Sequence, residues 1–216
     1  MRKDAARNRE LLIDAAREVF ASRGIEASLD EIAKHAGLGV GTAYRHFYNK
    51  HELVAACAQQ ALDRVVEIAE QALRVEDPWQ AIGGFFEGVL RLQAESRGLR
   101  EVFLGDYDPD EVGQPRERLV AALSLLLARG QRAGVVREDA EPSDLGFLVL
   151  MLCSVTDVAG SIAPDMWQRY LPMVLDGLRP GGADFGGRAL SAEEMADAIA
   201  AHKKELIRAT HIPRPE

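Results

Sequence analysis

Residues 29–48, LDEIAKHAGLGVGTAYRHFY, decide the fold, because they predict two short helices joined by a glycine turn. Ser28 and Glu31 have the spacing of a capping box, in which each side chain satisfies a backbone donor at the start of the first helix. Gly37 follows the last periodic residue, where a helix often ends in the left-handed conformation that glycine tolerates. This stretch therefore predicts a helix with a defined start, a turn and a second helix.

Apolar residues recur on one side of each of these two helices. In the first helix they are Leu29, Ile32, Ala33 and Ala36, at the three- and four-residue spacing of a buried face. The second helix is expected over residues 40–48, with Ala43 and Phe47 one turn apart on its packing side. Aromatic and basic side chains then face outward, which is typical of a DNA-binding helix-turn-helix.

A competing interpretation is that Gly37, Gly39 and Gly41 form a phosphate-binding loop. Loops of the dinucleotide type follow a buried β-strand, whereas a capped helix without a β-branched run precedes these glycines. The Lys-Ser/Thr pair of the Walker pattern is also absent from this stretch. The helix-turn-helix is therefore favoured over a nucleotide-binding loop.

Residues 9–53, which include GTAYRHFYNKHEL, resemble the N-terminal domain of the tetracycline-repressor (TetR) family of bacterial transcription regulators. The resemblance implies an all-helical homodimer whose first three helices bind DNA and whose larger C-terminal part binds a small effector. Gly39 and Val40 stand where the family often has Ser and a polar residue such as Lys. Potential phosphate or base contacts are thus missing, and the resemblance does not imply a particular operator sequence.

Several residues in and around this stretch are candidates for DNA contact. Arg45 is the candidate for a base contact, because a guanidinium can donate two hydrogen bonds to guanine O6 and N7; a phosphate contact is the alternative. The resemblance assigns backbone contacts to Thr42, Tyr44, His46 and Lys50, whose side chains can all donate to phosphate oxygens. The remaining candidates are Ser28, Leu29, Gly39, Val40 and Gly41. Packing against the first helix is the alternative for His46, and turn geometry is the alternative for Gly39 and Gly41.

Charge is distributed unevenly along the 216 residues, whose formal net charge is −8. Residues 1–50 contain nine Lys or Arg against seven Asp or Glu, while the remainder contains 17 against 27. The N-terminal region is therefore suited to a polyanion, and the acidic remainder would repel DNA from other faces. The basic start, MRKDAARNRE, is expected to be a disordered tail in the absence of DNA.

Other residue types exclude several classes of function. Cys57 and Cys153 form no C-x-x-C pair and are expected to be buried, which fits a reducing cytoplasm. The five histidines, at residues 35, 46, 51, 202 and 211, lie in the N-terminal region or the C-terminal tail, so a transition-metal site in the middle of the chain would lack imidazole ligands. We therefore expect no metal, and no cofactor is expected either. No spacing of Ser, His and Asp suggests a hydrolase. The longest apolar stretch, around residues 145–155, is too short to cross a bilayer.

The rest of the chain predicts helices throughout, so the expected fold class is all-α. A first helix is expected over residues 8–23, and a long helix capped by Asn49 over residues 50–75 links a DNA-binding head to a body. Further helices are expected over residues 79–96, 99–104, 115–133, 143–162 and 165–178. The last two of these are expected to form half of a four-helix bundle with a second copy. A capped accessory helix over residues 191–209 follows the glycine-rich linker PGGADFGGR.

The expected organisation has three parts. A DNA-binding domain spans residues 6–66, an effector-binding and dimerisation domain spans residues 67–180, and the linker with its accessory helix spans residues 181–216. Aromatic and polar residues of the body are candidates to line an effector pocket, with core packing as the alternative. These are Phe86, Gln93, Phe103, Tyr107, Met151, Asp157, Trp167 and Tyr170. Such a pocket would suit an apolar or aromatic molecule.

The sequence thus predicts a cytoplasmic homodimeric repressor that leaves a pseudo-palindromic operator when a small effector binds. A transcriptional activator of the same fold is one alternative. An all-α enzyme that binds a small molecule is the other, and the missing catalytic constellation argues against it.

Overall fold

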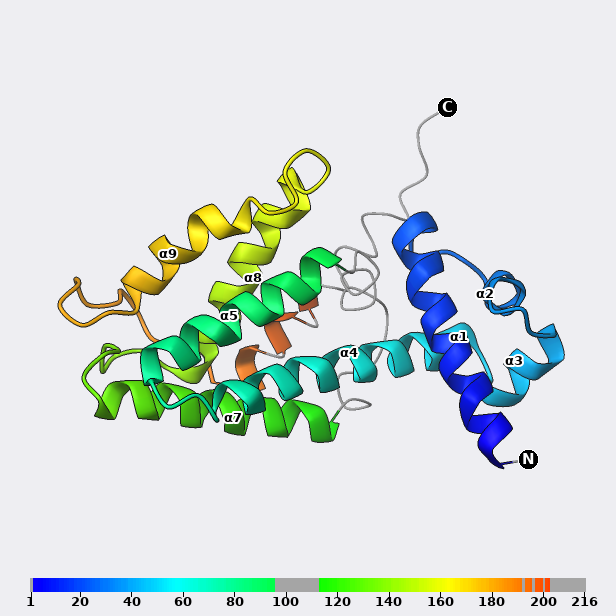
Figure 1. Ribbon diagram of the computed structural model, residues 1–216, viewed down its shortest axis with the longest axis horizontal. Helices are drawn as coiled ribbons and strands as arrows, with labels where there is room; N and C mark the ends of the chain where they lie inside the picture. Colours follow the sequence, from blue (N-terminus) through cyan, green and yellow to red (C-terminus); the bar gives the residue numbers. More distant parts are fainter. Residues whose placement is uncertain (1, 96–112, 192, 196, 200, 203–216) are drawn as a thin grey trace. The chain divides into compact units, whose positions relative to one another are not determined.

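The computed structural model describes residues 2–95, 113–191, 193–195, 197–199, 201 and 202. These residues form α-helices and connecting turns without a strand, so the predicted all-α class is confirmed for the described chain (Figure 1). The helices are α1 (Arg2–Arg23), α2 (Leu29–His35), α3 (Val40–His46), α4 (Lys50–Ala72), α5 (Pro78–Glu95), α7 (Gly113–Arg132), α8 (Pro142–Ala159) and α9 (Trp167–Gly177). None of them is long and apolar enough to span a membrane.

The described chain divides into two compact units, and the boundary between Leu62 and Asp63 falls inside α4. The first unit contains α1 to α3 and the start of α4, and the second contains the rest of α4 with α5 and α7 to α9. In the first unit α2 packs against α1 and α3, while in the second unit α5 packs against α8 and α9. Each unit has its own apolar core.

The core of the first unit uses the faces that helical periodicity assigns to the interior. Ile32, Ala33 and Ala43 are fully buried, and Phe47 is 2% exposed. Leu12 and Phe20 of α1 complete this core, as do Leu53, Val54 and Cys57 of α4. Because apolar burial is the main favourable term in folding, these faces hold α2 and α3 in place.

The predicted helix start and glycine turn are confirmed. The Ser28 N–H donates to Glu31 Oε2 at 2.8 Å, and the Glu31 N–H donates to Ser28 Oγ at 3.3 Å. These hydrogen bonds favour the carboxylate of Glu31 and lower its pKa. Gly37 has a φ of 69°, which places it in the left-handed region that the turn requires.

Several predicted boundaries differ from the structure. α1 begins at Arg2, so the expectation of a disordered basic start is wrong; Ala and Arg favour helix there, and Asp4 in the first turn complements the helix dipole. α3 ends at His46, because Phe47 is extended (φ −135°, ψ 115°) and its ring enters the core. α4 ends at Ala72 rather than Val75. The predicted helix over residues 99–104 lies outside the described residues.

In the second unit, α7 and the turn that follows it approach closely at Gly130. A Cβ at this position would lie 2.5 Å from Cγ2 of Val136 and 3.1 Å from Cδ1 of Ile82. Both neighbours are 1% exposed and belong to the core, so they have little room to move. The missing side chain of Gly130 is therefore what allows this contact.

We expect Gly130→Ala to lower the free energy of unfolding by about 1–3 kcal/mol, because the added methyl group overpacks a filled core. The matched control is Gly84→Ala in α5, where a Cβ would meet nothing within 4 Å. Replacing glycine in this exposed helical position should raise the free energy of unfolding by about 0.5–1 kcal/mol. Chemical denaturation measures both changes, and equal stability of the two variants would contradict the close contact at Gly130.

Candidate nucleic-acid interface

The outer surface of α3 carries side chains that can donate hydrogen bonds to DNA. Tyr44 is 51% exposed, Arg45 is exposed beside it, and Thr42 and His46 are half-buried. Tyr48, just beyond the helix, is 81% exposed. α3 therefore presents a phenol and a guanidinium to solvent from a helix whose opposite face is fixed in the core.

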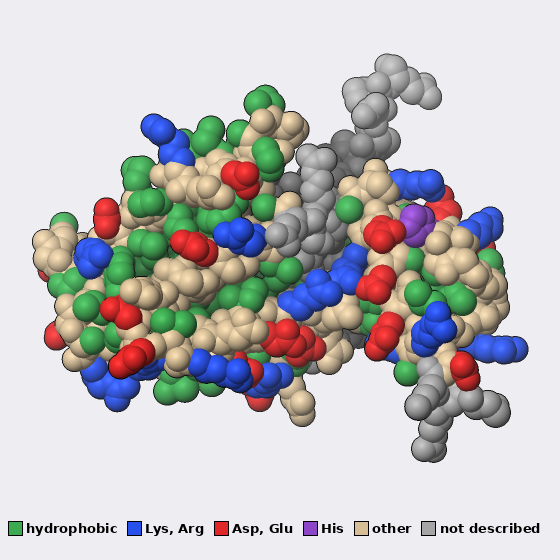
Figure 2. Space-filling model, viewed as in Figure 1, with side chains coloured by type: hydrophobic (Ala, Val, Ile, Leu, Met, Phe, Trp, Pro, Cys, Tyr) green, Lys and Arg blue, Asp and Glu red, His purple; other side chains and the backbone are tan. Residues whose placement is uncertain are grey.

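The charges around α3 are arranged so that Arg45 is available to a partner. Elsewhere in the first unit, Glu31 pairs with Arg23 at 3.7 Å, and Glu18 shares a hydrogen bond of 2.7 Å with the His35 ring. Basic and acidic side chains accordingly alternate over the surface of α1 to α3 (Figure 2). Within the part of the chain that the structure describes, Arg45 forms no ion pair.

Tyr44 has a partner that helical periodicity could not indicate. The carboxylate of Asp30 in α2 faces the phenol, and its negative charge and hydrogen bonding raise the pKa of Tyr44. A tyrosine phenol is already protonated at neutral pH, and the raised pKa keeps it so. The sequence does not indicate this pairing, because it depends on how α2 and α3 pack.

The backbone conformation does not require glycine at residues 39 and 41. Gly39 precedes α3 with φ −68° and ψ 140°, which other residues adopt readily, and neither glycine has a positive φ. A Cβ at Gly41 would meet nothing within 4 Å. Both glycines are exposed, and Val40 between them is half-buried. Gly39 is also the N-cap of α3, a position that glycine favours, and close approach of DNA to the backbone at both glycines stays a prediction.

Three further candidate residues have partners or surroundings inside the first unit. The Ser28 hydroxyl donates to Glu31 Oε2 at 2.9 Å as part of the capping box. Leu29 is 2% exposed, so its side chain is a core residue and only its backbone could approach DNA. Lys50 donates from Nζ to the backbone carbonyl oxygen of Ile25 at 2.9 Å. Lys50 therefore also connects the start of α4 to the turn before α2.

The structure does not bring the described effector candidates together on one cavity. Phe86 is fully buried in the core of the second unit, whereas Met151 is 60% exposed and Tyr170 is 37% exposed. Gln93 is half-buried. Phe103 and Tyr107 lie outside the described residues, and so does the side chain of Asp157, although its backbone belongs to α8. Contact of these residues with an effector stays a prediction.

Trp167 is the candidate that lines a groove. This groove, of about 400 Å³, lies between α5 and α9. Its lining includes Trp79, Arg91, Trp167, Gln168 and Arg179. Trp167 itself is 2% exposed, and its indole N–H has no hydrogen-bond partner. The Arg179 guanidinium lies 3.9 Å from the ring centre of Trp79. This guanidinium therefore already covers the wall of the groove that Trp79 forms.

Both cysteines are buried, as the sequence predicts. Burial raises the pKa of the Cys57 thiol to about 12, so the thiol stays protonated and unreactive at neutral pH. Among the described residues, no group of three or more His, Cys, Asp or Glu side chains could hold a metal ion.

Two family models match the chain. The model described as bacterial regulatory proteins of the TetR family matches residues 12–57, which contain α2 and α3. The model described as the C-terminal domain of SbtR-like transcriptional regulators matches residues 77–180, which contain α5 and α7 to α9. The first match therefore lies in the first unit, which contains the candidate interface, and the second match covers most of the second unit.

Individual relatives agree with these models. The HTH-type transcriptional activator FasR of Mycolicibacterium smegmatis is 40% identical over 107 residues, which are 47% of this chain and 47% of FasR. An HTH-type regulator of Staphylococcus aureus is 44% identical over 64 residues, which are 29% of this chain and 35% of that protein. This chain thus spans less than half the length of each of these two relatives.

Solved structures extend the similarity over most of the chain. A PfmR regulator of the TetR family from Thermus thermophilus is 26% identical, with a TM-score of 0.62, over 82% of this chain and 97% of that one. The TetR transcription regulatory protein from Mycobacterium vanbaalenii is 34% identical, with a TM-score of 0.60, over 82% of this chain and 98% of that one. The chain therefore belongs to the TetR family of bacterial transcription regulators.

Proposed function

We propose that this regulator is a cytoplasmic homodimeric repressor, which binds a pseudo-palindromic operator through α3 and leaves it when a small molecule binds to the second unit. The observation that carries the DNA-binding part is the exposed pair Tyr44 and Arg45 on a helix that the core holds rigidly. In a dimer, two copies of α3 would enter successive major grooves about 34–36 Å apart.

The surface of α8 and α9 supports the dimer. Apolar side chains of these helices and of the turn between them are exposed, among them Val158 (86%), Ile162 (91%) and Met173 (68%). Such side chains are visible over α8 and α9 in Figure 2. Met151 and Tyr170, candidates for effector contact, share this exposure and fit an interface at least as well. Exposed apolar patches of this kind mark protein interfaces, and two helices from each copy would complete a four-helix bundle.

α4 is the proposed route of communication between effector and DNA. Its start is attached to the first unit through Lys50 and the Ile25 carbonyl. Just beyond its end, Arg129 of α7 donates to the carbonyl oxygens of Leu73 (2.6 Å), Val75 (2.7 Å) and Glu76 (3.1 Å). An effector that favours one arrangement of α7 would act directly on α4, provided that it binds the two arrangements with different affinity.

A transcriptional activator is the second candidate. It is favoured by FasR, a relative that is named as an activator. In vitro transcription from the promoter that the protein binds separates the two functions. A repressor lowers the transcript yield when bound, whereas an activator raises it.

We expect Arg45→Ala to weaken binding to the operator by about 1–3 kcal/mol and to change binding to scrambled DNA little, because base contacts carry discrimination. Fluorescence anisotropy over a salt series measures both, with the DNA upstream of the gene as the first operator to test. Arg132→Ala removes an equal charge from α7 and is the control, since among the described residues its Nε donates only to the Ala128 carbonyl of its own helix.

Equal weakening on both DNAs would assign Arg45 to phosphate contact instead of base recognition. Absence of DNA binding by the wild type at any salt concentration would contradict the regulator function and favour the enzyme alternative. Release of bound operator by members of a panel of apolar and aromatic compounds would identify the effector class.

We expect Arg129→Ala to increase hydrogen exchange at the end of α4 and to weaken operator binding. Three carbonyl groups lose a charged donor, and hydrogen bonds to charged groups contribute about 1.5–3 kcal/mol each. Arg132→Ala is again the matched control on the same helix. If the two variants exchange at the same rate and bind the operator equally, Arg129 does not hold α4.

A further inference from the structure

The chain continues after α9 into a segment with contacts of its own. The family model of the second domain ends at residue 180. Residues 180–197, here called the strap, belong to the same compact unit as α7 to α9. The sequence predicts a glycine-rich linker here, but the structure holds its described residues at two anchor points.

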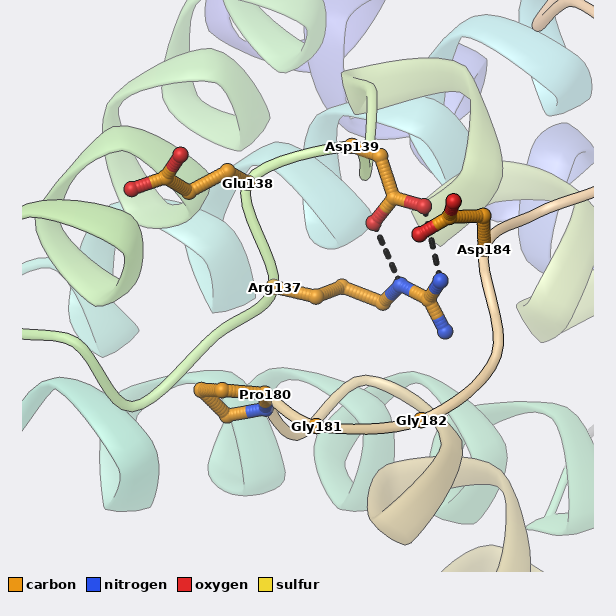
Figure 3. Close-up of a pocket in the computed structure, with 7 residues that line it drawn as sticks. All are labelled: Arg137, Glu138, Asp139, Pro180, Gly181, Gly182 and Asp184. Atoms are coloured by element: carbon orange, nitrogen blue, oxygen red, sulfur yellow. Dashed lines mark hydrogen bonds and ion pairs between the residues drawn. The ribbon is translucent and has the colours of Figure 1, made fainter.

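The first anchor is Arg137, in the turn between α7 and α8, whose residue surface is 9% exposed. Its Nε donates to Asp139 Oδ1 at 2.5 Å, and its Nη2 donates to the Ala183 carbonyl of the strap at 2.6 Å. Its Nη1 donates to the carbonyl of Gly177, the last residue of α9, at 3.3 Å. Figure 3 shows the Arg137 side chain reaching from the turn toward the strap, with Asp139 beside it. One guanidinium thus joins the turn, α9 and the strap.

Phe185 of the strap closes this anchor. Its ring centre lies 3.7 Å from Cζ of Arg137, and its N–H donates to Asp139 Oδ2 at 3.0 Å. The hydrogen bonds from Arg137 and then from Phe185 hold the pKa of Asp139 well below its usual range. The Arg137 side chain is 9% exposed and that of Asp139 is 38% exposed. A nearly buried guanidinium needs hydrogen-bond acceptors, and the strap supplies the Ala183 carbonyl to Arg137 and the Phe185 N–H to Asp139.

The second anchor lies on α8. The methyl group of Met195 occupies the space that a Cβ at Gly146 would need, so α8 has a notch that fits this side chain. The strap helix that carries Met195 starts at a capping box, in which the Ser191 N–H donates to Glu194 Oε2 at 2.8 Å. Arg188 binds the same carboxylate at 2.7 Å and contributes most to lowering the pKa of Glu194 to about 2. These bonds position Met195, the next residue.

We propose that the strap is an intramolecular clamp that sets the position of α8 relative to α9 and thereby determines how strongly two copies associate. This inference rests on the proposed homodimer through these helices. Gly146 is one helical turn from Leu150, which is 43% exposed on α8, and Arg137 binds the end of α9. The strap therefore contacts α8 directly at Gly146 and α9 only through Arg137. Each contact lies about one helical turn from an exposed apolar residue, Leu150 on α8 and Met173 on α9.

Two adjacent glycines provide a matched test. Gly187 has a φ of 91°, which strains any other residue, whereas Gly186 has no positive φ, and a Cβ would meet nothing within 4 Å at either position. We expect Gly187→Ala to speed tryptic cleavage after Arg188 and to raise the dimer dissociation constant about tenfold, because the left-handed conformation is lost. Gly186→Ala should leave both within about twofold of the wild type. Sedimentation of the full chain without DNA gives the dissociation constant.

Gly146→Ala tests the second anchor independently. Its methyl group competes with the Met195 methyl for one space, so we expect faster cleavage and weaker association, as for Gly187→Ala. Met195→Ala vacates this space. The double variant Gly146→Ala/Met195→Ala should therefore be cleaved no faster, and should associate no more weakly, than Met195→Ala alone. Circular dichroism verifies that each variant keeps its helices.

Each outcome has a defined meaning. Faster cleavage together with weaker association supports the clamp. Equal cleavage of the Gly187→Ala and Gly186→Ala chains would overturn the docked strap, and faster cleavage at an unchanged dissociation constant would overturn its effect on association. A wild type that is monomeric at every concentration would instead overturn the proposed dimer, and the clamp role with it.

Discussion

Backbone carbonyl groups near the ends of helices need partners from outside the helix, and much of this structure depends on how cationic side chains supply them. α4 is the element that the two units share, and each unit contributes one such contact near an end of it. Lys50 binds the Ile25 carbonyl in the first unit, and Arg129 binds three carbonyls that follow α4 in the second. The helix dipole makes a cation at a C-terminal end favourable in addition to the hydrogen bonds. α4 is thus attached inside both units, as its proposed role as the route of communication requires.

The DNA-binding unit could be predicted in detail because its determinants are local. The capping box joins residues three apart, and the left-handed turn depends on Gly37 alone. The buried faces of α2 and α3 follow from helical periodicity over fewer than twenty residues. What periodicity could not show is the approach of Asp30 to Tyr44 across two helices, or the extended backbone of Phe47 that shortens α3.

The second unit was less predictable because its specific contacts are distant in sequence and often involve the backbone. Arg129 reaches carbonyls 53 to 56 residues earlier, and Arg137 reaches Ala183, 46 residues later. A pattern of side chains in the sequence does not indicate which backbone carbonyl group will accept a hydrogen bond from a distant arginine. Aromatic residues at helical spacing were equally ambiguous, since Phe86 is in the core and Tyr170 is partly exposed. In PGGADFGGR the glycines suggested a linker, whereas the structure docks Phe185 of this segment against Arg137.

The hydrogen bond between Lys50 and the Ile25 carbonyl has a consequence for the entropy of DNA binding. A lysine side chain in solution samples many rotamers, and fixing it costs up to about 2 kcal/mol. Here the Lys50 side chain is already held in the absence of DNA, and its ammonium group uses one of its three protons for the Ile25 carbonyl. If Lys50 contacts a phosphate, the two remaining protons can do so from a pre-organised position. Such a contact would lose little conformational freedom on association, which makes it stronger than one from a mobile surface lysine.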